Sequence, residues 1–554
     1  MLGRDVVLDS LVAHGVEFVY GNPGTTEGPL TDNLSAYPTL SYILSLHEGV
    51  SIGAASYYAQ ASGRTGFVNL HVAPGLGNAI GMLYGALKAN SPMIVTAGQQ
   101  DTRLRLRAPL LGHDLVAMAA PVVKWSVQAE RADECADIMR RAFKIANDPP
   151  AGPVFVALPI NVMEQETANR ADSGGSHYRA PGADPDAVQD LAKHLLSAGA
   201  PAIVIGDDVA RAGAGNAVAE LAEALGAPIW LEVIHQHRAV PSDHPNLRGV
   251  LPIDAASIAA AFGETDLVLL IGGPFFEEIW FSEGTPFPPG AAVLQIEESQ
   301  ERLSRNYALT AGLVGGLAPA VSLIADAVQK KASASDRKSA ERRCQQLMSL
   351  KEEESTSQRA RLERQKDRRP MPMALAMTVL AEAVPNDVVI VEEAITASPD
   401  LTRAFHFSGP GDYFCGRGGG IGQGLAGALG VQLANPDRPV VCISGDGSAM
   451  YSITALWTAA HHNLPIVFII LSNREYRILK HNVDIYRQRF GIESNRAYAQ
   501  LDLREPELGF VEMAAGMGVA GQRVKEPEEL VTALGEALAS GAPRLIDVAI
   551  EPKS

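Results

Sequence analysis

The stretch Gly445-Asp446-Gly447-Ser448 and the later Asn473 have the residue types of a site for a divalent cation and a diphosphate. Asp446 follows an apolar run at 440–443, and Asn473 follows a second run at 466–471, with a helical segment between them. Short apolar runs bounded by turn residues predict buried strands. Both polar side chains would then emerge at one edge of a parallel sheet, which is where open α/β sheets bind ligands.

The oxygen atoms available at this edge suit Mg²⁺. The Asp446 carboxylate, the Asn473 amide oxygen and the backbone carbonyl of Glu475 form a hard oxygen set, which phosphate and water oxygens commonly complete around Mg²⁺. The glycines beside Asp446 let a diphosphate approach the backbone, and the following helix offers its N-terminal N–H groups. The sequence therefore predicts a magnesium-diphosphate site here.

Three further polar residues follow predicted strands in the first part of the chain. The strands are expected to end near Tyr20, Leu46 and Leu70, and the residues that follow them include Thr25, Glu48 and His71. Since strand ends of a parallel sheet gather catalytic groups, we expect these three side chains at one sheet edge.

The length and composition limit what must position these groups. A chain of 554 residues is too long for one core and indicates about three domains. We predict an α/β fold of three doubly wound parallel-sheet domains. Their expected bounds are 1–170 (N-terminal), 180–330 (middle, mainly structural), 331–370 (charged helical linker) and 371–554 (diphosphate- and Mg²⁺-binding).

The charge and cysteine content exclude several functions. A net charge of −17 disfavours nucleic acid and anionic membranes as partners. The four cysteines are scattered without a CxxC motif, so they predict neither a zinc site nor a disulfide framework and fit a reducing cytoplasm. No apolar run reaches 18 residues, and the N-terminus reads as an amphipathic helix rather than a signal peptide.

Several stretches together resemble the thiamine diphosphate-dependent decarboxylase and carboligase superfamily, and most closely its benzoylformate decarboxylase branch. They are GNPGTTE (21–27), LHEG (46–49), NLHVAPGLGNAIG (69–81), SPMIVTAGQQ (91–100), VVKWS (122–126), GGIG (419–422), LGVQLANPDR (429–438) and GDGSAMYSITALWTAA (445–460). The resemblance covers nearly the whole chain. It implies an enzyme that requires thiamine diphosphate and Mg²⁺ and builds its active site between two chains.

The resemblance implies a role for each matching residue. Glu48 would hydrogen-bond N1′ of the cofactor's aminopyrimidine and so promote loss of the thiazolium C2 proton. His71 would handle proton transfer, and Thr25 would bind the substrate carboxylate, at a position that is serine in benzoylformate decarboxylases. The expected cofactor contacts are Asn22, Pro23, Glu48, Asn78, Ile395, Thr396, Gly419, Ile421, Gly445, Asp446, Gly447, Ser448, Asn473 and Tyr476. Among these, Ile421 would wedge the cofactor into its bent form, and Asn22, Pro23 and Asn78 would contribute from the opposite subunit.

The chain departs from the family pattern at a few positions. Ile279 stands where the branch has a second catalytic histidine, and isoleucine cannot move protons. The nearest substitute is His113, in a loop that carries His or Gln in other branches. Ile478 replaces a small residue and Ile395 replaces a threonine, so the substrate pocket is expected to be tighter and more apolar.

The expected reaction is non-oxidative decarboxylation of a 2-keto acid to an aldehyde, by a cytoplasmic homodimer or homotetramer. One alternative is a carboligase or C–C lyase, similar to acetolactate synthases or 2-hydroxyacyl-CoA lyases, because loss of a proton donor favours carboligation. The acetolactate synthase alternative is weakened by the lack of an evident flavin-site signature in the middle domain. A catalytically inactive regulatory subunit is a further alternative, against which the activating carboxyl of Glu48 argues.

Overall fold

The structure is a computed structural model that describes residues 1–172 and 181–552. The chain divides into two compact units. Unit 1 comprises 1–177, 367–405 and 414–554, and unit 2 comprises 178–366 and 406–413. Most of the predicted boundary between the first two domains, 170–180, lies outside the described residues. No helix in the described ranges is both long and apolar enough to cross a membrane.

Unit 1 begins with a six-stranded parallel sheet in the order β2-β1-β3-β4-β6-β5. Its strands are β1 (Phe18–Gly21), β2 (Ser41–Leu44), β3 (Gly66–Leu70), β4 (Met93–Gln99), β5 (Ser126–Gln128) and β6 (Pro153–Pro159). The helices between and around them are α1 (Gly3–Ala13), α2 (Gly28–Asn33), α3 (Glu48–Ser62), α4 (Val72–Lys88), α5 (Leu115–Ala119), α6 (Cys135–Asn147) and α7 (Ile160–Met163). The inner strands β3, β4 and β6 are buried along their whole length, as parallel strands covered on both faces must be.

A second six-stranded sheet of unit 1 has the order β14-β13-β15-β16-β18-β17, in which β13, β15, β16, β18 and β17 pair in parallel. Its strands are β13 (Val389–Glu393), β14 (Tyr413–Cys415), β15 (Val440–Gly445), β16 (Val467–Ser472), β17 (Ala520–Val524) and β18 (Arg544–Ala549). The accompanying helices are α14 (Met373–Ala383), α15 (Ser398–Ala404), α16 (Gln423–Ala434), α17 (Asp446–Ala449), α18 (Ala455–His461), α19 (Arg477–Arg489), α20 (Phe510–Gly516) and α21 (Pro527–Ala539).

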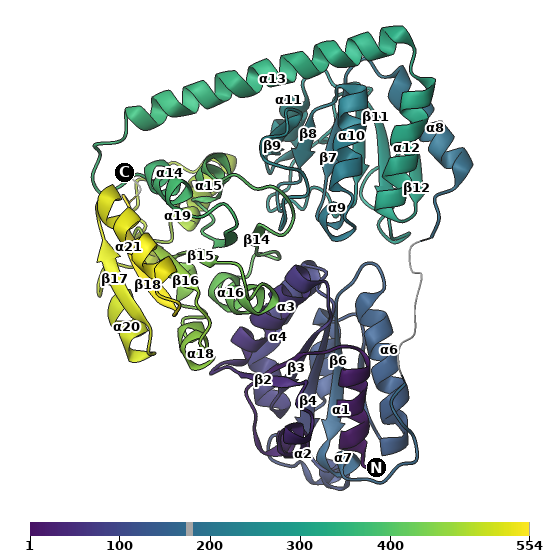
Figure 1. The fold of residues 1–554 in the computed structure, drawn as a ribbon, viewed down its shortest axis with the longest axis vertical. Coiled ribbons are helices and arrows are strands. Elements are labelled where there is room, and N and C mark those ends of the chain that lie inside the picture. The colour runs from purple at the N-terminus through teal and green to yellow at the C-terminus, as the bar shows by residue number, and fades with distance from the viewer. Residues whose placement is uncertain (173–180, 553–554) are drawn as a thin grey trace. The chain divides into compact units, whose positions relative to one another are not determined.

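Helices α3 and α16 join the two sheets of unit 1 through one hydrophobic core (Figure 1). The two helices approach closely because glycines face small residues. A Cβ atom on Gly430 would lie 1.9 Å from the carbonyl oxygen of Ala54, and one on Gly53 would lie 2.7 Å from the Cβ of Ala426. Larger side chains at these glycines would push the helices apart.

Unit 2 contains the third six-stranded parallel sheet, in the order β12-β11-β10-β7-β8-β9. Its strands are β7 (Pro201–Ile205), β8 (Ile229–Leu231), β9 (Leu247–Val250), β10 (Leu267–Ile271), β11 (Ala292–Glu297) and β12 (Ala311–Val314). Its helices are α8 (Pro185–Ser197), α9 (Asp208–Arg211), α10 (Gly215–Leu225), α11 (Ala255–Phe262), α12 (Leu317–Lys331) and α13 (Ala334–Glu363). The predicted fold class, α/β with three doubly wound parallel sheets, is confirmed.

Helix α13 is long, and only Ala340 and Leu347 of its residues are buried. Polar side chains fasten it to unit 2 instead. Arg343 donates to the carbonyl of Leu225, and the Lys351 ammonium lies 2.7 Å from the carbonyls of Ser242 and His244. This helix lies within the segment predicted as a charged helical linker.

Candidate active site

Glu48 is the first residue of α3 rather than a loop residue before a helix. The ring Nδ1 atom of His47 caps the helix by accepting from the Gly49 N–H at 3.0 Å. The Glu48 side chain is 7 % exposed, and its Oε2 atom accepts from the Asn78 amide nitrogen on α4 at 3.0 Å. The two residues were predicted separately as cofactor contacts, and the structure brings them together.

His71 pairs with a carboxylate to which the sequence analysis assigned no role. Its Nδ1 atom lies 2.8 Å from Oε2 of Glu27, whose side chain is fully buried. Glu27 also accepts the backbone N–H groups of Gly24 and Gly98, each at 2.9 Å. A Cβ atom at position 24 would lie 2.1 Å from the His71 ring, so this position requires glycine. The signal that was available in the sequence is the position of Glu27 at the end of GNPGTTE, directly after a strand.

Thr25 and its neighbour Thr26 have opposite environments. Thr26 is buried, and its hydroxyl donates to Oε1 of Glu27 at 2.7 Å and lies 3.5 Å from Nδ1 of His71. Thr25 is exposed. Thr26 therefore supports the His71–Glu27 pair, whereas Thr25 stays open to solvent, as its predicted contact with a substrate requires.

His113 and Ile279 both have solvent-exposed side chains. His113 lies in the loop before α5, where its backbone carbonyl accepts from the Gln99 side chain at the end of β4 at 2.8 Å. Ile279, in unit 2, is 64 % exposed. The proton-transfer role predicted for His113 stays a prediction.

Asp446 and Asn473 emerge at the carboxyl ends of the adjacent strands β15 and β16, as expected. Asp446 is 4 % exposed, and its carboxylate accepts the backbone N–H groups of Gly447 at 2.8 Å and Arg474 at 2.6 Å. The pKa of Asp446 is raised to about 6, mainly by burial and in part by nearby Asp547, although the N–H groups of Arg474 and Gly447 act to lower it. The Asn473 amide oxygen accepts from the Glu475 N–H at 3.0 Å.

These groups fit a divalent cation and a diphosphate. A buried carboxylate near other acidic groups is stabilised by a bound cation, and the available donors are the oxygen atoms that Mg²⁺ prefers. Position 447 requires glycine, because a Cβ there would lie 2.3 Å from the Tyr476 ring, which packs directly against the backbone. No cluster of three or more His, Cys, Asp and Glu side chains suited to a metal occurs among the described residues. The predicted Mg²⁺ ligands differ from such a cluster, because they comprise one carboxylate, one side-chain amide and one backbone carbonyl.

The side chain of Glu475 makes ion pairs, and its backbone carbonyl, which is the predicted ligand, accepts from the Arg477 N–H at 2.9 Å. The carboxylate is buried and lies 2.5 Å from the Lys480 ammonium and 3.3 Å from Nε of Arg477. Lys480 in turn contacts Asp502 at 2.6 Å. These ion pairs tie the loop after Asn473 to the start of α19.

Six further predicted cofactor contacts lie in loops of unit 1, whereas Gly445 ends β15 and Ser448 lies in α17. Ile395 is 48 % exposed, Ile421 and Thr396 are half-buried, and Gly419 is exposed. Asn22 is half-buried and Pro23 is exposed, both directly after β1. The contacts of these residues with the cofactor stay predictions.

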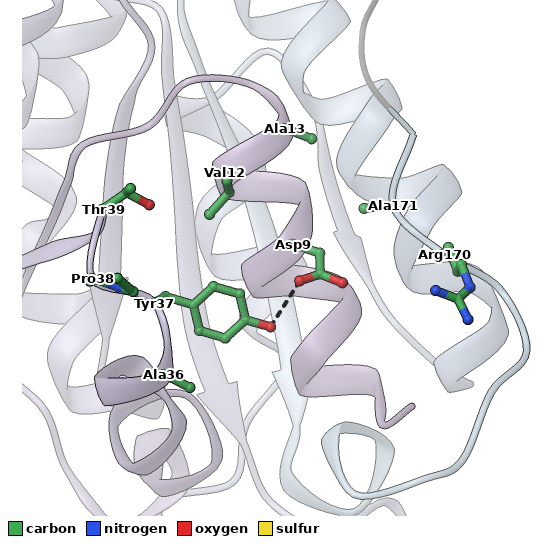
Figure 2. Close-up of a pocket in the computed structure, with 9 residues that line it drawn as sticks. All are labelled: Asp9, Val12, Ala13, Ala36, Tyr37, Pro38, Thr39, Arg170 and Ala171. Carbon is green, nitrogen blue, oxygen red and sulfur yellow. Dashed lines mark hydrogen bonds between the residues drawn. The ribbon is translucent and has the colours of Figure 1, made fainter.

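A pocket of about 410 Å³ elsewhere in unit 1 is shown in Figure 2. It is lined by Asp9, Val12, Ala13, Ala36, Tyr37, Pro38, Thr39, Arg170 and Ala171. The Tyr37 hydroxyl donates to Asp9 at 2.9 Å across it. None of the predicted site residues lines this pocket.

Comparison with known proteins matches three parts of the chain to thiamine pyrophosphate enzymes. They are the N-terminal TPP binding domain over residues 1–118, the central domain over 188–324 and the C-terminal TPP binding domain over 396–548. Benzoylformate decarboxylase from Pseudomonas aeruginosa is 34% identical over 550 residues, with 97% of each chain covered. Acetolactate synthase isozyme 3 large subunit from Escherichia coli is 26% identical and covers 97% of this chain and 92% of its own.

Solved structures of similar proteins agree with these matches. The thiamine diphosphate-dependent 4-hydroxybenzoylformate decarboxylase of Rhodococcus jostii superposes with a TM-score of 0.86 at 29% identity, covering 100% of both chains. Benzoylformate decarboxylase from Polynucleobacter necessarius gives a TM-score of 0.86 at 26% identity, covering 99% of this chain and 98% of its own. The chain therefore belongs to the thiamine pyrophosphate enzyme family, as its motifs predicted, and is a thiamine diphosphate-dependent enzyme of the carboxy-lyase and carboligase class.

Proposed function

We propose that this enzyme decarboxylates a 2-keto acid to an aldehyde, using thiamine diphosphate and Mg²⁺. The observation that carries the proposal is the His71–Glu27 pair at the same sheet edge as Glu48. A buried carboxylate that orients a partly exposed histidine serves proton transfer, and a protein that only bound the cofactor would not need it.

Different residues of this chain would hold the cofactor, the metal ion and the substrate. The bound cofactor supplies the electron sink for decarboxylation. Asp446, Asn473 and the Glu475 carbonyl would hold Mg²⁺ against its diphosphate. Glu48 would hold a proton at N1′ of the aminopyrimidine, and Thr25 would bind the substrate carboxylate.

His71 would exchange protons with the reacting substrate through Nε2. Its Nδ1 atom must carry the other proton, because the Glu27 carboxylate that it contacts can only accept. His113 would be the second proton donor, in place of the histidine that Ile279 replaces. The expected substrate pocket is apolar at Ile395 and Ile478.

A second candidate function is carboligation or C–C lysis. Ile279 favours it, because an enzyme with one fewer proton donor would protonate the decarboxylated intermediate more slowly. An acetolactate synthase-like function with flavin has less support. The strand ends of β7 and β10, where such sheets bind dinucleotides, are closely packed, since a Cβ on Gly206 would lie 2.3 Å from the Gly272 carbonyl.

We further propose a cytoplasmic homodimer or homotetramer, since the family's site forms between two chains. All four cysteines are free thiols, which fits a reducing compartment. The test of the proposed function is product analysis with a panel of aryl and alkyl 2-keto acids, with and without an acceptor aldehyde. Cofactor-dependent aldehyde release without acceptor supports it. Acyloin as the main product favours the second candidate, and no turnover of any keto acid would overturn both.

A further inference from the structure

The loop 418–422, here called the glycine loop, consists of four glycines and Ile421. Gly418, Gly419 and Gly422 have φ angles of 85°, 72° and 99°, in the region that L side chains rarely adopt. Glycine reaches such angles freely, but it also loses the most conformational freedom when it is ordered. Ile421, the expected cofactor contact, lies in this loop. Groups outside the loop are therefore needed to hold its backbone in one conformation.

One restraint comes from Glu393 at the end of β13. Its carboxylate is 6 % exposed and accepts three successive backbone N–H groups, from Gly422 at 2.7 Å, Gln423 at 2.9 Å and Gly424 at 2.8 Å. These are donors of the first turn of α16, which have no partner within the helix. Glu393 therefore holds the end of the glycine loop against β13.

The second restraint is the side chain of Gln423, which is also 6 % exposed. Its amide nitrogen donates to the carbonyls of Arg417 at 2.9 Å and Gly420 at 2.7 Å. One amide thus ties the residue before the glycine loop to the residue next to Ile421. Glu393 and Gln423 together bind the loop at its beginning, middle and end.

We propose that Glu393 and Gln423 are positioning residues that order the glycine loop before the cofactor binds, so that Ile421 is already in place. The proposal rests on the proposed function, because Ile421 is expected to contact the cofactor. Neither side chain needs to touch the cofactor, since both act through the loop backbone. A loop that is already ordered in the free protein loses less conformational entropy on binding, so the free energy of cofactor binding is more favourable.

The test is Gln423→Met, which keeps the length of the side chain and removes its donors. The matched control is Gln432→Met in the same helix. The Gln432 side chain is 2 % exposed and also donates to two carbonyls, those of Asn435 and Arg438, but at the opposite end of α16. A general loss of stability would affect both variants alike.

In the cofactor-free full-length protein, Gln423→Met should speed amide hydrogen exchange in 418–422, and Gln432→Met should not. Calorimetry with thiamine diphosphate and Mg²⁺ should show the Kd raised roughly five- to tenfold in Gln423→Met alone, as expected for one or two lost hydrogen bonds. Glu393→Gln puts an N–H donor where an acceptor is needed and should give the same two changes. If Gln423→Met does not fold, the exchange rates and the Kd of Glu393→Gln test the proposal instead.

Unchanged exchange in the glycine loop together with an unchanged Kd in the folded variants would overturn the proposal. Equal changes in Gln423→Met and Gln432→Met would also overturn it, because the effect would then be one of general stability. A wild-type protein that binds no thiamine diphosphate would contradict the proposed function instead. The exchange rates would still decide whether the two side chains order the loop.

Discussion

The Nδ1 atom of His71 lies 2.8 Å from the carboxylate of Glu27, whose side chain is fully buried, whereas the histidine side chain is 22 % exposed. The two residues come from different strand ends, with Glu27 after β1 and His71 after β3. Because the carboxylate accepts a hydrogen bond from Nδ1–H, the other ring nitrogen, Nε2, is left to exchange a proton with a ligand. The pair therefore fixes both the orientation and the tautomer of the histidine.

Glu27→Gln should reduce kcat by roughly 10- to 10³-fold, since an amide cannot select the tautomer as a carboxylate does. The Kd for thiamine diphosphate should be unchanged, because Glu27 lies behind His71. Steady-state kinetics and calorimetry measure the two values. The control is Glu17→Gln, which removes a carboxylate of the same sheet that accepts from Tyr58 and not from His71. Equal kcat in wild type and Glu27→Gln would show that the pair is structural only.

Glu48→Gln should keep the cofactor and lose turnover by about 10²–10⁴-fold, the usual size of a general acid–base contribution. The amide oxygen of the variant can still accept the hydrogen bond from Asn78, but the amide cannot supply the proton expected at N1′. The measurement is exchange of the thiazolium C2 proton of the bound cofactor, followed by NMR. Exchange at the wild-type rate would show that the role assigned to Glu48 is wrong.

Asp446→Ala should abolish the Mg²⁺ dependence of thiamine diphosphate binding and weaken that binding at least about tenfold, because the cation loses its only carboxylate ligand. Titration calorimetry with and without Mg²⁺ tests this. Asp266→Asn is the control, since Asp266 also accepts two backbone N–H groups, those of Gly199 and Ala200, but lies in unit 2. An unchanged affinity in Asp446→Ala would contradict the metal site.

His71→Ala and His113→Ala should impair different steps. His71→Ala should slow the whole reaction, whereas His113→Ala should leave decarboxylation measurable and raise the ratio of acyloin to aldehyde. Ile279→His should shift the products back towards aldehyde. The ratio is measured with one keto acid at a fixed acceptor concentration. If His113→Ala leaves it unchanged, His113 is a surface residue and the second proton donor lies elsewhere.

Glu297, at the end of β11 in unit 2, should make stability depend on pH. Its pKa is raised to about 7, mainly by burial and in part by Asp208, although hydrogen bonds from Gln295 and Gly273 act to lower it. The folded state therefore holds this proton more tightly than the unfolded state. The associated stability is full below about pH 4.3 and is lost as the pH rises to about 7.

Across that range the wild type should lose up to about 3 kcal/mol of unfolding free energy relative to Glu297→Gln, which does not titrate. Denaturant unfolding at pH 5 and pH 8 measures the difference. Parallel pH curves for the two proteins would contradict the shifted pKa of Glu297.

Local patterns in the chain were enough to predict the fold class and most of the candidate site. Four predicted site residues each follow a strand that can be recognised from its apolar run alone, and parallel strands end at a common sheet edge. They are Asp446, Asn473, Glu48 and His71. The short strands β5, β9 and β12 were not predicted, because three or four residues at a sheet edge carry little periodic signal. The individual strands β6, β13, β14, β17 and β18 were not predicted either, although an α/β unit was expected in each of these regions.

The sequence by itself determined the family, the α/β architecture and which residue types stand at the strand ends, because these depend on short-range spacing. Only the tertiary structure decided which of those groups meet. Glu27 reaches His71, Glu393 reaches the first turn of α16, and Asn78 reaches Glu48, each across many residues of chain. Such hydrogen bonds form only after packing has brought distant backbone segments together and removed water from between them, so no local pattern encodes them.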